Sequence, residues 1–457
     1  MKSARGGLWG LGMSFKALVR WQNLRRILSS IREIGFWQTL KKTAYYTRLH
    51  LRGGGHSSME AVATETATGD GSGYLTLFWR EMAQKQAFHI TSAPASLTGK
   101  RRIAMIGDLN LAQCRKYRVE QLADLWAGND LAYDFSHYED IPRASHLLQD
   151  ATHLMLYRTQ NTALMDMYLY EARRLRLPIL YDIDDPLFSV SAYETYENMT
   201  ALPEGLKTHF VNEAPKYLSA MAAADIITVS TPGLVDHARE YLSRPIYYRR
   251  NFADAATLAA ADGLPDSSAQ KATGGFRVAF ASGSQGHEVD FALIAADMHR
   301  FLAADPARKL VLLGHFDLGL LPADLRAQVE SHKFTDYAGY LGHLASCHAA
   351  VMPLTDDIFN RCKSAVRVLD AGAVGVPVIV PDVGDFAAVV KPGKTGFVLN
   401  GDQGQNGGWY DALDHLAQDR TAALAMGAAA AKDLRRNWTA RLRRPIIEPE
   451  VVKWVRA

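Results

Sequence analysis

The chain contains the same short pattern twice: an apolar strand that ends at a glycine, followed by a helical segment. The first copy is RRIAMIG (101–107) with the helical segment 114–126, and the second is FRVAFASG (276–283) with the helical segment 288–304. Further apolar strands alternate with helical segments after each copy, at 153–158, 178–184, 225–231, 309–314, 349–354 and 377–382. Such alternation is typical of parallel sheets that helices cover on both faces. Two complete sets therefore predict an α/β fold with two doubly wound, Rossmann-like domains.

This pattern divides the 457 residues into five parts. We expect a basic amphipathic helical arm at 1–55, a linker with a short helix at 56–99, a first Rossmann-like domain at 100–255, a second at 272–432, and a C-terminal helix at 433–457 that crosses back. In doubly wound sheets ligands bind beyond the carboxyl ends of the strands. We therefore expect the two domains to face each other across a cleft that holds the ligand.

The N-terminal arm carries most of the positive charge of the chain. Residues 1–55 hold eleven Lys and Arg and one acid, Glu33, whereas the net charge of the whole chain is only +3. An apolar stripe repeats there at helical spacing: Leu24, Ile27, Leu28, Ile31 and Ile34. A basic amphipathic helix of this kind predicts binding to an anionic membrane surface. A helix packed on the protein itself, or a mitochondrial transit peptide, are the alternatives.

Composition excludes several other classes of protein. Hydrophobic residues make up 48% of the chain and charged residues 22%, as in ordinary globular proteins. Cys114, Cys347 and Cys362 lie far apart without a CxxC pair, which argues against structural zinc and a disulfide framework. No apolar run reaches the about 18 residues of a membrane span. Because the body of the chain is mildly acidic, we expect no nucleic-acid partner.

The densest group of candidate site residues lies in FNRCKSAVRVLDAGAVGVPVIV (359–380). Lys363, Arg367 and Asp370 follow one another at i, i+4 and i+7, which places them on one face of a helix that begins near Ser364. A helix N-terminus with two cations favours a diphosphate. Asp370, about two turns further on, is suited to accept hydrogen bonds from ribose hydroxyls. The alternative is a surface ion pair between Arg367 and Asp370.

The stretch PLTDDIFNRCKSAVRVLDAGAVGVPVIVPDVGD (353–385) resembles the donor-binding segment of GT-B glycosyltransferases of family 4, also called glycosyltransferases group 1. Supporting segments occur in the order that this family has, at 114–126, 177–188, 223–238, 249–254, 280–291 and 312–316. The resemblance implies a GT-B fold, with an acceptor domain first and a donor domain second. It also implies transfer of a sugar from a nucleoside diphosphate with retention of anomeric configuration, without a metal or other cofactor.

The resemblance assigns roles to single residues. Asp370 matches the second acid of the family motif, which holds the ribose, whereas the first acid falls on Cys362. We expect Asn360 and Lys363 to take over part of the sugar contact that this acid makes. Lys363 and Arg367 would bind the donor phosphates. Three residues of one loop would line the donor pocket, and one glycine would let the first loop approach the sugar: Gly283, Ser284 and His287 in the former role, Gly107 in the latter.

The acidic sequence DIDD (182–185) has two readings. An Asp-x-Asp at a strand end holds a metal in GT-A glycosyltransferases, but the two-domain pattern favours the metal-free GT-B arrangement. We therefore expect Asp182 and Asp185 to face the cleft and to orient an acceptor hydroxyl. The simpler alternative is that Asp184 or Asp185 caps a helix before Pro186.

These inferences predict a glycosyltransferase of bacterial surface polysaccharide or glycolipid assembly. Its partners would be a nucleotide-sugar donor, a glycan or lipid-linked acceptor, and an anionic membrane through residues 1–55. The expected location is the cytoplasm, with peripheral attachment to the inner membrane. Two alternatives remain: a nucleotide-sugar 2-epimerase of the same fold, and a non-catalytic protein that binds sugar nucleotides or glycans.

Overall fold

The computed structural model describes residues 99–127, 130–282, 286–401, 404, 406–443 and 445–457. The basic arm at 1–55 and nearly all of the linker at 56–99 therefore lie outside the described residues. The described residues all belong to one compact unit of the chain.

The first sheet has six parallel strands in the order β2-β1-β3-β4-β5-β6. The strands are β1 (Arg101–Gly107), β2 (Leu131–His137), β3 (His153–Tyr157), β4 (Ile179–Ile183), β5 (Ile226–Val229) and β6 (Ile246–Tyr248). The helical elements of this domain are α7 (Ala112–Cys114), the π-helical η1 (Arg115–Glu120), α8 (Gln121–Ala127), α9 (Ile141–Gln149), α10 (Ala163–Arg174), α11 (Val190–Thr195), the 3-10 helix η2 (Glu197–Ala201), α12 (Glu204–Ala222) and α13 (Pro232–Arg239).

The second sheet also has six parallel strands, in the order β12-β11-β10-β7-β8-β9. The strands are β7 (Arg277–Ser282), β8 (Lys309–Gly314), β9 (Val329–His332), β10 (Ala349–Val351), β11 (Val378–Pro381) and β12 (Gly396–Leu399). The helical elements of this domain are α14 (Ala255–Asp262), α15 (Ser268–Thr273), α16 (His287–Ala292), α17 (Ala295–Ala303), η3 (Leu318–Leu320), η4 (Ala323–Gln328), α18 (Tyr337–Ala345), α19 (Ile358–Arg361), α20 (Val366–Ala373), α21 (Phe386–Val389), α23 (Gly408–Gln418) and α24 (Arg420–Asn437). The chain then ends with α25 (Pro449–Arg456), which lies against the first domain.

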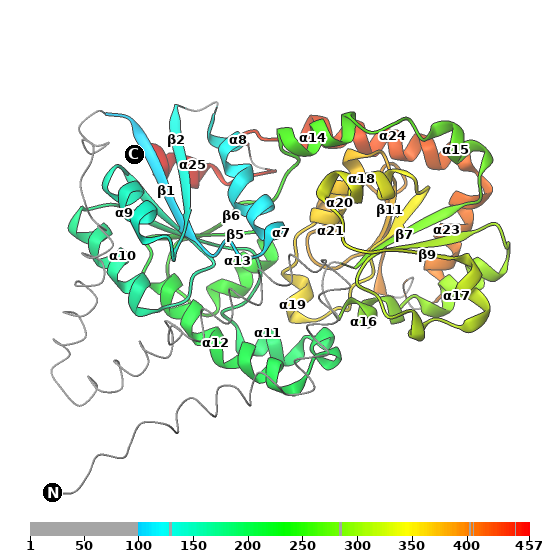
Figure 1. The fold of residues 1–457 in the computed structure, drawn as a ribbon, viewed down its shortest axis with the longest axis horizontal. Helices are drawn as coiled ribbons and strands as arrows, with labels where there is room; N and C mark the ends of the chain where they lie inside the picture. The colour runs from blue at the N-terminus through cyan, green and yellow to red at the C-terminus, as the bar shows by residue number, and fades with distance from the viewer. Residues whose placement is uncertain (1–98, 128–129, 283–285, 402–403, 405, 444) are drawn as a thin grey trace, which may run out of the picture. The chain divides into compact units, whose positions relative to one another are not determined.

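Both sheets lie between layers of helices, as Figure 1 shows for β1 and β7. The central strands β3 and β4 are buried at every residue, which explains why their sequences are apolar at nearly every position rather than alternating. Hydroxyl side chains begin two of the helices around them, because Thr162 caps α10 and Thr231 caps α13. The predicted fold class, two doubly wound Rossmann-like domains, is confirmed.

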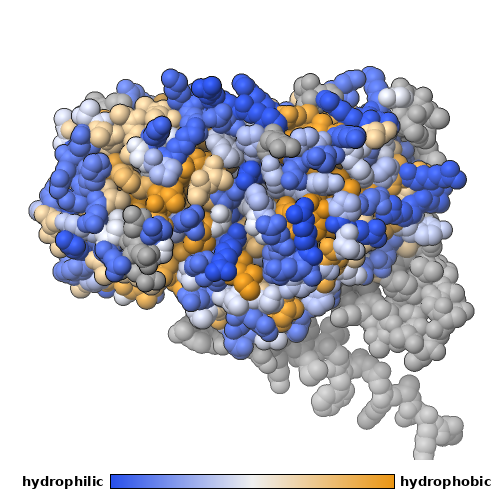
Figure 2. Space-filling view, turned by 180° about the vertical axis from the view of Figure 1, so that it is seen from behind, coloured by the Kyte–Doolittle hydropathy of each residue, from blue (hydrophilic) through white to orange (hydrophobic). Residues whose placement is uncertain are grey.

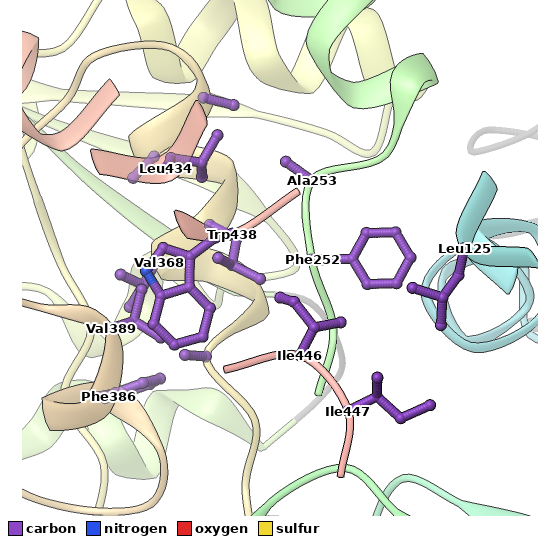
Figure 3. Packing of buried hydrophobic residues seen from close by; sticks show 14 of the residues in the cluster. Leu125, Phe252, Ala253, Val368, Phe386, Val389, Leu434, Trp438, Ile446 and Ile447 are labelled. Atoms are coloured by element: carbon purple, nitrogen blue, oxygen red, sulfur yellow. The ribbon is translucent and has the colours of Figure 1, made fainter. Parts of the chain in front are cut away.

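The chain passes between the two domains twice, and the two passages lie side by side. The Arg250 amide donates to the Ile446 carbonyl at 2.7 Å, and the Ala253 amide donates to the Trp438 carbonyl at 2.8 Å. Figure 3 shows the packing here: Phe252 points toward Leu125 of the first domain. The passages are thus part of a buried apolar cluster that continues from one domain into the other.

The last residues return to the first domain, although not as the single helix expected at 433–457. Helix α24 ends at Asn437, a crossing segment without regular structure follows, and α25 begins at Pro449. Val451 and Val455 of α25 are each 1% exposed, and Trp454 lies 5.2 Å from His153 of β3 between ring centroids. The sequence between the helices contains Pro445, which cannot donate a helical hydrogen bond.

The surface of the described residues is mainly hydrophilic, with hydrophobic side chains in separate areas on the face that Figure 2 shows. No helix among the described residues has the length and hydropathy that crossing a membrane requires.

Candidate functional site

A cavity of about 610 Å³ lies between the two domains, at the carboxyl ends of both sheets. The first domain contributes residues of α7 and η1 together with the turn after β4. The second domain contributes the start of α16, the segment after β9, and the start of α20. Both doubly wound sheets therefore direct their strand ends into one space, where such folds bind ligands.

Lys363, Arg367 and Asp370 all line this cavity. They do not share one helix face as predicted, because α20 begins at Val366 and Lys363 lies in the turn before it. The predicted alternative, an Arg367–Asp370 ion pair, does not form in the described structure: Arg367 Nη1 instead donates to the Ala281 carbonyl at 2.9 Å. The three side chains thus line the same cavity from a turn and the helix that follows it, rather than from one continuous helix.

The ammonium group of Lys363 lies over two aromatic rings, 5.3 Å from the Tyr196 centroid and 5.2 Å from the Phe359 centroid. Burial acts to lower the Lys363 pKa, but Tyr196 and the Asp185 carboxylate outweigh burial and raise that pKa. Lys363 therefore stays protonated as a partly desolvated cation in the cavity.

Asp370 is buried and accepts two short hydrogen bonds from tyrosines. The Tyr337 hydroxyl donates to Oδ1 and the Tyr117 hydroxyl to Oδ2, each at 2.7 Å. Burial raises the pKa of Asp370 to about 6, although both hydroxyls and Lys116 favour the charged form. Tyr117 belongs to the first domain, so this carboxylate joins the two domains.

The two acids after β4, Asp184 and Asp185, both line the cavity. Asp184 accepts from Arg158 Nη1 at 3.1 Å and from the Tyr157 hydroxyl at 3.2 Å. Arg158 has a φ of 49°, a conformation that bulky residues seldom adopt and that often marks functional sites. Burial and the neighbouring Asp184 charge raise the pKa of Asp185, which suits it to take up a proton.

Asp182 does not face the cavity, contrary to the prediction. It is fully buried below the cavity and pairs with two arginines, at 2.6 Å to Arg118 Nη2 and 3.0 Å to Arg249 Nη2. Thr228 donates a further hydrogen bond at 2.6 Å. Burial acts to raise the Asp182 pKa, but the two guanidinium groups outweigh it and hold the pKa below its ordinary value. Asp182 thus connects β4, η1 and the first passage between the domains.

His287 lines the cavity at the start of α16. Its Nδ1 lies 2.8 Å from Asp290 Oδ2, and the same oxygen accepts from Asn198 Nδ2 of the first domain at 2.7 Å. Burial lowers the His287 pKa more than the Asp290 carboxylate raises it, and the nearby Arg367 and Lys363 charges lower it further. The imidazole is therefore neutral near pH 7.

Two other predicted residues, Gly107 and Asn360, do not line the cavity. A Cβ at Gly107 would lie 2.8 Å from Cβ and the carbonyl oxygen of Tyr157, so strand packing requires this glycine. Asn360 is buried and donates from Nδ2 to Asp357 at 2.9 Å. Ser364 does line the cavity, but its Oγ accepts from Asn251 Nδ2 at 3.0 Å instead of capping α20. Gly283 and Ser284 lie outside the described residues.

Tyr117, Tyr337 and Asp290 are site residues that the sequence analysis did not find. Tyr117 lies in CRKYRVEQLADLW (114–126), which the pattern marked only as a helix. The structure has a π-helical turn there, and such turns occur frequently at functional sites. The described residues contain no group of three or more His, Cys, Asp and Glu side chains placed to hold a metal ion.

Comparison with known proteins agrees with this geometry. Residues 277–419, which contain the second sheet with Lys363, Arg367 and Asp370, match the family model described as Glycosyl transferases group 1. This segment therefore matches the family that the sequence resembles, and the prediction of a glycosyltransferase is confirmed at the level of this domain. No curated protein matches the chain.

Several solved structures resemble the chain at low identity. Sucrose-phosphate synthase from Thermosynechococcus elongatus is 15% identical, with 74% of this chain and 95% of that chain covered and a TM-score of 0.47. HepE from Anabaena, solved with UDP and glucose, is 12% identical, with 74% and 96% covered and a TM-score of 0.46. WaaG, a glycosyltransferase involved in lipopolysaccharide biosynthesis, is 9% identical, with 73% and 95% covered and a TM-score of 0.48.

Proposed function

We propose that the chain transfers a sugar from a nucleoside diphosphate to an acceptor hydroxyl in the cavity between its two domains. The observation that carries the proposal is the meeting of Lys363, Arg367 and Asp370 of the second domain with Asp185 of the first. Two cations and a ribose-binding acid suit a donor nucleotide on one side. A carboxylate with a raised pKa suits an acceptor hydroxyl on the other.

The donor diphosphate would lie against Lys363, Arg367 and the first turn of α20. The departing diphosphate gains negative charge during transfer, and positioned cations in a closed site stabilise that charge. Amide groups at the start of α20 add a favourable dipole. Asp370 would accept hydrogen bonds from the ribose hydroxyls with the lone pairs that the two tyrosines leave unused.

The acceptor hydroxyl would approach Asp185 from the first domain. Asp185 is the stronger candidate among the acids after β4, because Arg158 and Tyr157 engage Asp184 and two arginines engage Asp182. Retention of configuration, which the family resemblance implies, requires attack on the side of the leaving group. Asp185 would then act as the base that removes the acceptor proton, without forming a covalent bond to the sugar.

The proposed reaction needs no divalent metal. In a GT-A site, the acids at 182 and 184 would hold the cation. Here Arg118 and Arg249 contact both oxygens of Asp182, and Arg158 contacts both oxygens of Asp184. Guanidinium groups therefore contact the carboxylate oxygens that a metal ion would need as ligands. In the proposed reaction Lys363 and Arg367 stabilise the negative charge of the donor diphosphate.

We further propose that the acceptor is a glycan or lipid-linked sugar of a bacterial surface polysaccharide or glycolipid. The charge and apolar stripe of residues 1–55 support attachment to the cytoplasmic face of the inner membrane. The full chain should cosediment with vesicles that contain anionic lipid, and less so at high salt. Equal cosedimentation of a chain lacking residues 1–55 would contradict the proposed anchor.

The test of the central proposal is a thermal-shift screen of the full chain against UDP-, GDP-, dTDP- and ADP-sugars. A ligand that binds only the folded state raises the apparent stability by mass action. One nucleotide class should raise the melting temperature, and the purified protein should slowly hydrolyse that donor. Binding without hydrolysis or transfer would favour a non-catalytic binding protein. Conversion of the sugar without an acceptor would favour a 2-epimerase.

A further inference from the structure

The family motif leaves one sugar contact without a residue to make it. Cys362 occupies the position of the first acid, yet its side chain does not line the cavity. Cys362 is 1% exposed and packs among apolar residues of the first domain, with Sγ 4.0 Å from the Gly233 carbonyl oxygen. Its own carbonyl accepts from Thr231 at 2.9 Å, which holds this orientation. A sugar hydroxyl therefore needs another acceptor in this chain.

His287 has the position and the orientation to be that acceptor. It belongs to the second domain and lines the cavity, and the positive charges of Lys363 and Arg367 lower its pKa. A sugar on the β-phosphate of a donor held by these two cations would lie beside His287. Asn360, the other residue expected to replace the acid, is engaged with Asp357 outside the cavity.

Hydrogen bonding determines which nitrogen of His287 faces a ligand as an acceptor. The Asp290 carboxylate can only accept, so Nδ1 carries the proton that lies in this 2.8 Å contact. Asp290 is fully buried and is itself held by Asn198 Nδ2 at 2.7 Å and by the Thr355 amide at 3.4 Å. In the neutral ring Nε2 then has a lone pair, and within the described residues no side chain or amide donates to it.

We propose that Nε2 of His287, oriented by Asp290, accepts a hydrogen bond from a hydroxyl of the donor sugar and so replaces the acid of the family motif. The inference rests on the proposed function, because it needs a nucleotide sugar in this cavity. It adds that donor recognition here uses a histidine–aspartate pair, and that His287 distinguishes the sugar from the bare nucleotide.

The test compares two ligands by titration calorimetry: the nucleotide sugar selected in the thermal-shift screen and the bare diphosphate of the same base. In His287→Ala and His287→Asn the sugar nucleotide should bind about fivefold to tenfold more weakly, since one hydrogen bond is lost. The bare diphosphate should bind as in the wild type, within twofold. His287→Gln should retain most of the affinity for the sugar nucleotide, because its Oε1 can reach the place of Nε2.

His315 provides a matched control. Its Nδ1 forms a similar contact with Glu288 at 3.2 Å, but the side chain is 47% exposed and does not line the cavity. His315→Ala should leave both affinities unchanged. An equal loss for sugar nucleotide and bare diphosphate in His287→Ala would overturn the inference in favour of a phosphate contact or a structural role. Unchanged binding of both would exclude any contact. If the wild-type protein binds no nucleotide, the proposed function fails, and this inference fails with it.

Discussion

The hydroxyl of Tyr117 in the first domain donates a 2.7 Å hydrogen bond to Asp370 in the second. Asp370 is the acid that the family motif assigns to the ribose, so the contact between domains and the proposed donor contact use the same carboxylate. Tyr337, on the same domain as Asp370, donates to the other oxygen at the same distance. The two tyrosines therefore allow the domain contact to be separated from the local one.

Tyr117→Phe should weaken the closed arrangement of the domains. A hydrogen bond to a charged group contributes about 1.5–3 kcal/mol, and its loss should favour more open conformations. We expect a larger radius of gyration in small-angle scattering and faster proteolysis near residues 253–275. Tyr337→Phe removes an equivalent bond within one domain and should leave both measurements as in the wild type. The same change in both variants would contradict a specific role of Tyr117 in holding the domains together.

Donor binding should depend on pH through Asp370, whose pKa burial raises to about 6. The donor KM should rise as the pH falls below about 6, because the protonated carboxyl accepts ribose hydroxyls poorly. The free energy of unfolding should depend on pH in the opposite sense, because Asp370 favours the folded state most at low pH, where donor binding is weakest. An acid with a raised pKa binds its proton more tightly when folded, so its stabilising contribution is full below about pH 4 and is lost as the pH rises through about 6.

Asp370→Asn provides the control, since it removes the titrating group but retains the shape. Its donor KM should be high and nearly constant between about pH 5 and pH 7. This pH range includes the pKa of about 6 at which the wild-type carboxyl titrates. A wild-type pH dependence that persists unchanged in Asp370→Asn would assign the titration to another group.

Lys363→Ala should lower kcat/KM by about 100-fold or more. A charge-assisted contact that strengthens in the transition state contributes about 2–4 kcal/mol, which corresponds to this factor. Lys432→Ala, at an exposed position on α24, is the matched loss of one positive charge and should change kcat/KM little. Unchanged kinetics in a folded Lys363→Ala protein would exclude the proposed phosphate contact.

Asp182→Ala should destabilise the fold by about 3–5 kcal/mol, because it leaves two arginines buried without their common partner. Urea unfolding measures this change. Asp262→Ala breaks an ion pair with Arg435 whose side chains are 62% and 41% exposed, and should cost less than about 1 kcal/mol. If Asp182→Ala were as stable as the wild type but inactive, the earlier expectation of an acceptor contact would regain support.

Transfer activity should survive treatment with EDTA. The oxygens of Asp182 and Asp184 already contact arginines, so these acids are not available as a metal-binding pair. Activity is measured with and without the chelator, and then after addition of manganese. Complete loss that manganese restores would instead indicate a metal site.

The sheets could be predicted from the sequence because strands that are buried on both faces consist of short apolar runs, which can be recognised locally. Strands such as β3 and β4 are apolar at nearly every residue, and helices follow them at regular intervals. The residues of the cavity were harder to predict where their role depends on distant partners. Asp182 resembles a cleft residue until Arg118, 64 positions earlier, is seen to pair with it.

The same limit explains the errors around Asp370. Lys363, Arg367 and Asp370 were grouped correctly, but a break before Val366 cannot be read from their spacing. The spacing also says nothing of Tyr117, which is 253 positions away. The sequence shows that Cys362 interrupts the family motif. Only its packing against the first domain shows that its side chain does not line the cavity.

The return of α25 to the first domain has a consequence for biosynthesis. Ile103, Trp126 and His153 of the first domain line one small cavity together with Val451 and Val455 of α25, although α25 follows the whole second domain in the sequence. Domains usually fold one after another from the N-terminus during translation. Here the domain translated first cannot complete its core until the second domain and α25 have been translated, because α25 comes after all strands of the second sheet. Removal of residues 449–457 would thus damage the first domain rather than the second, which precedes α25 directly in the sequence.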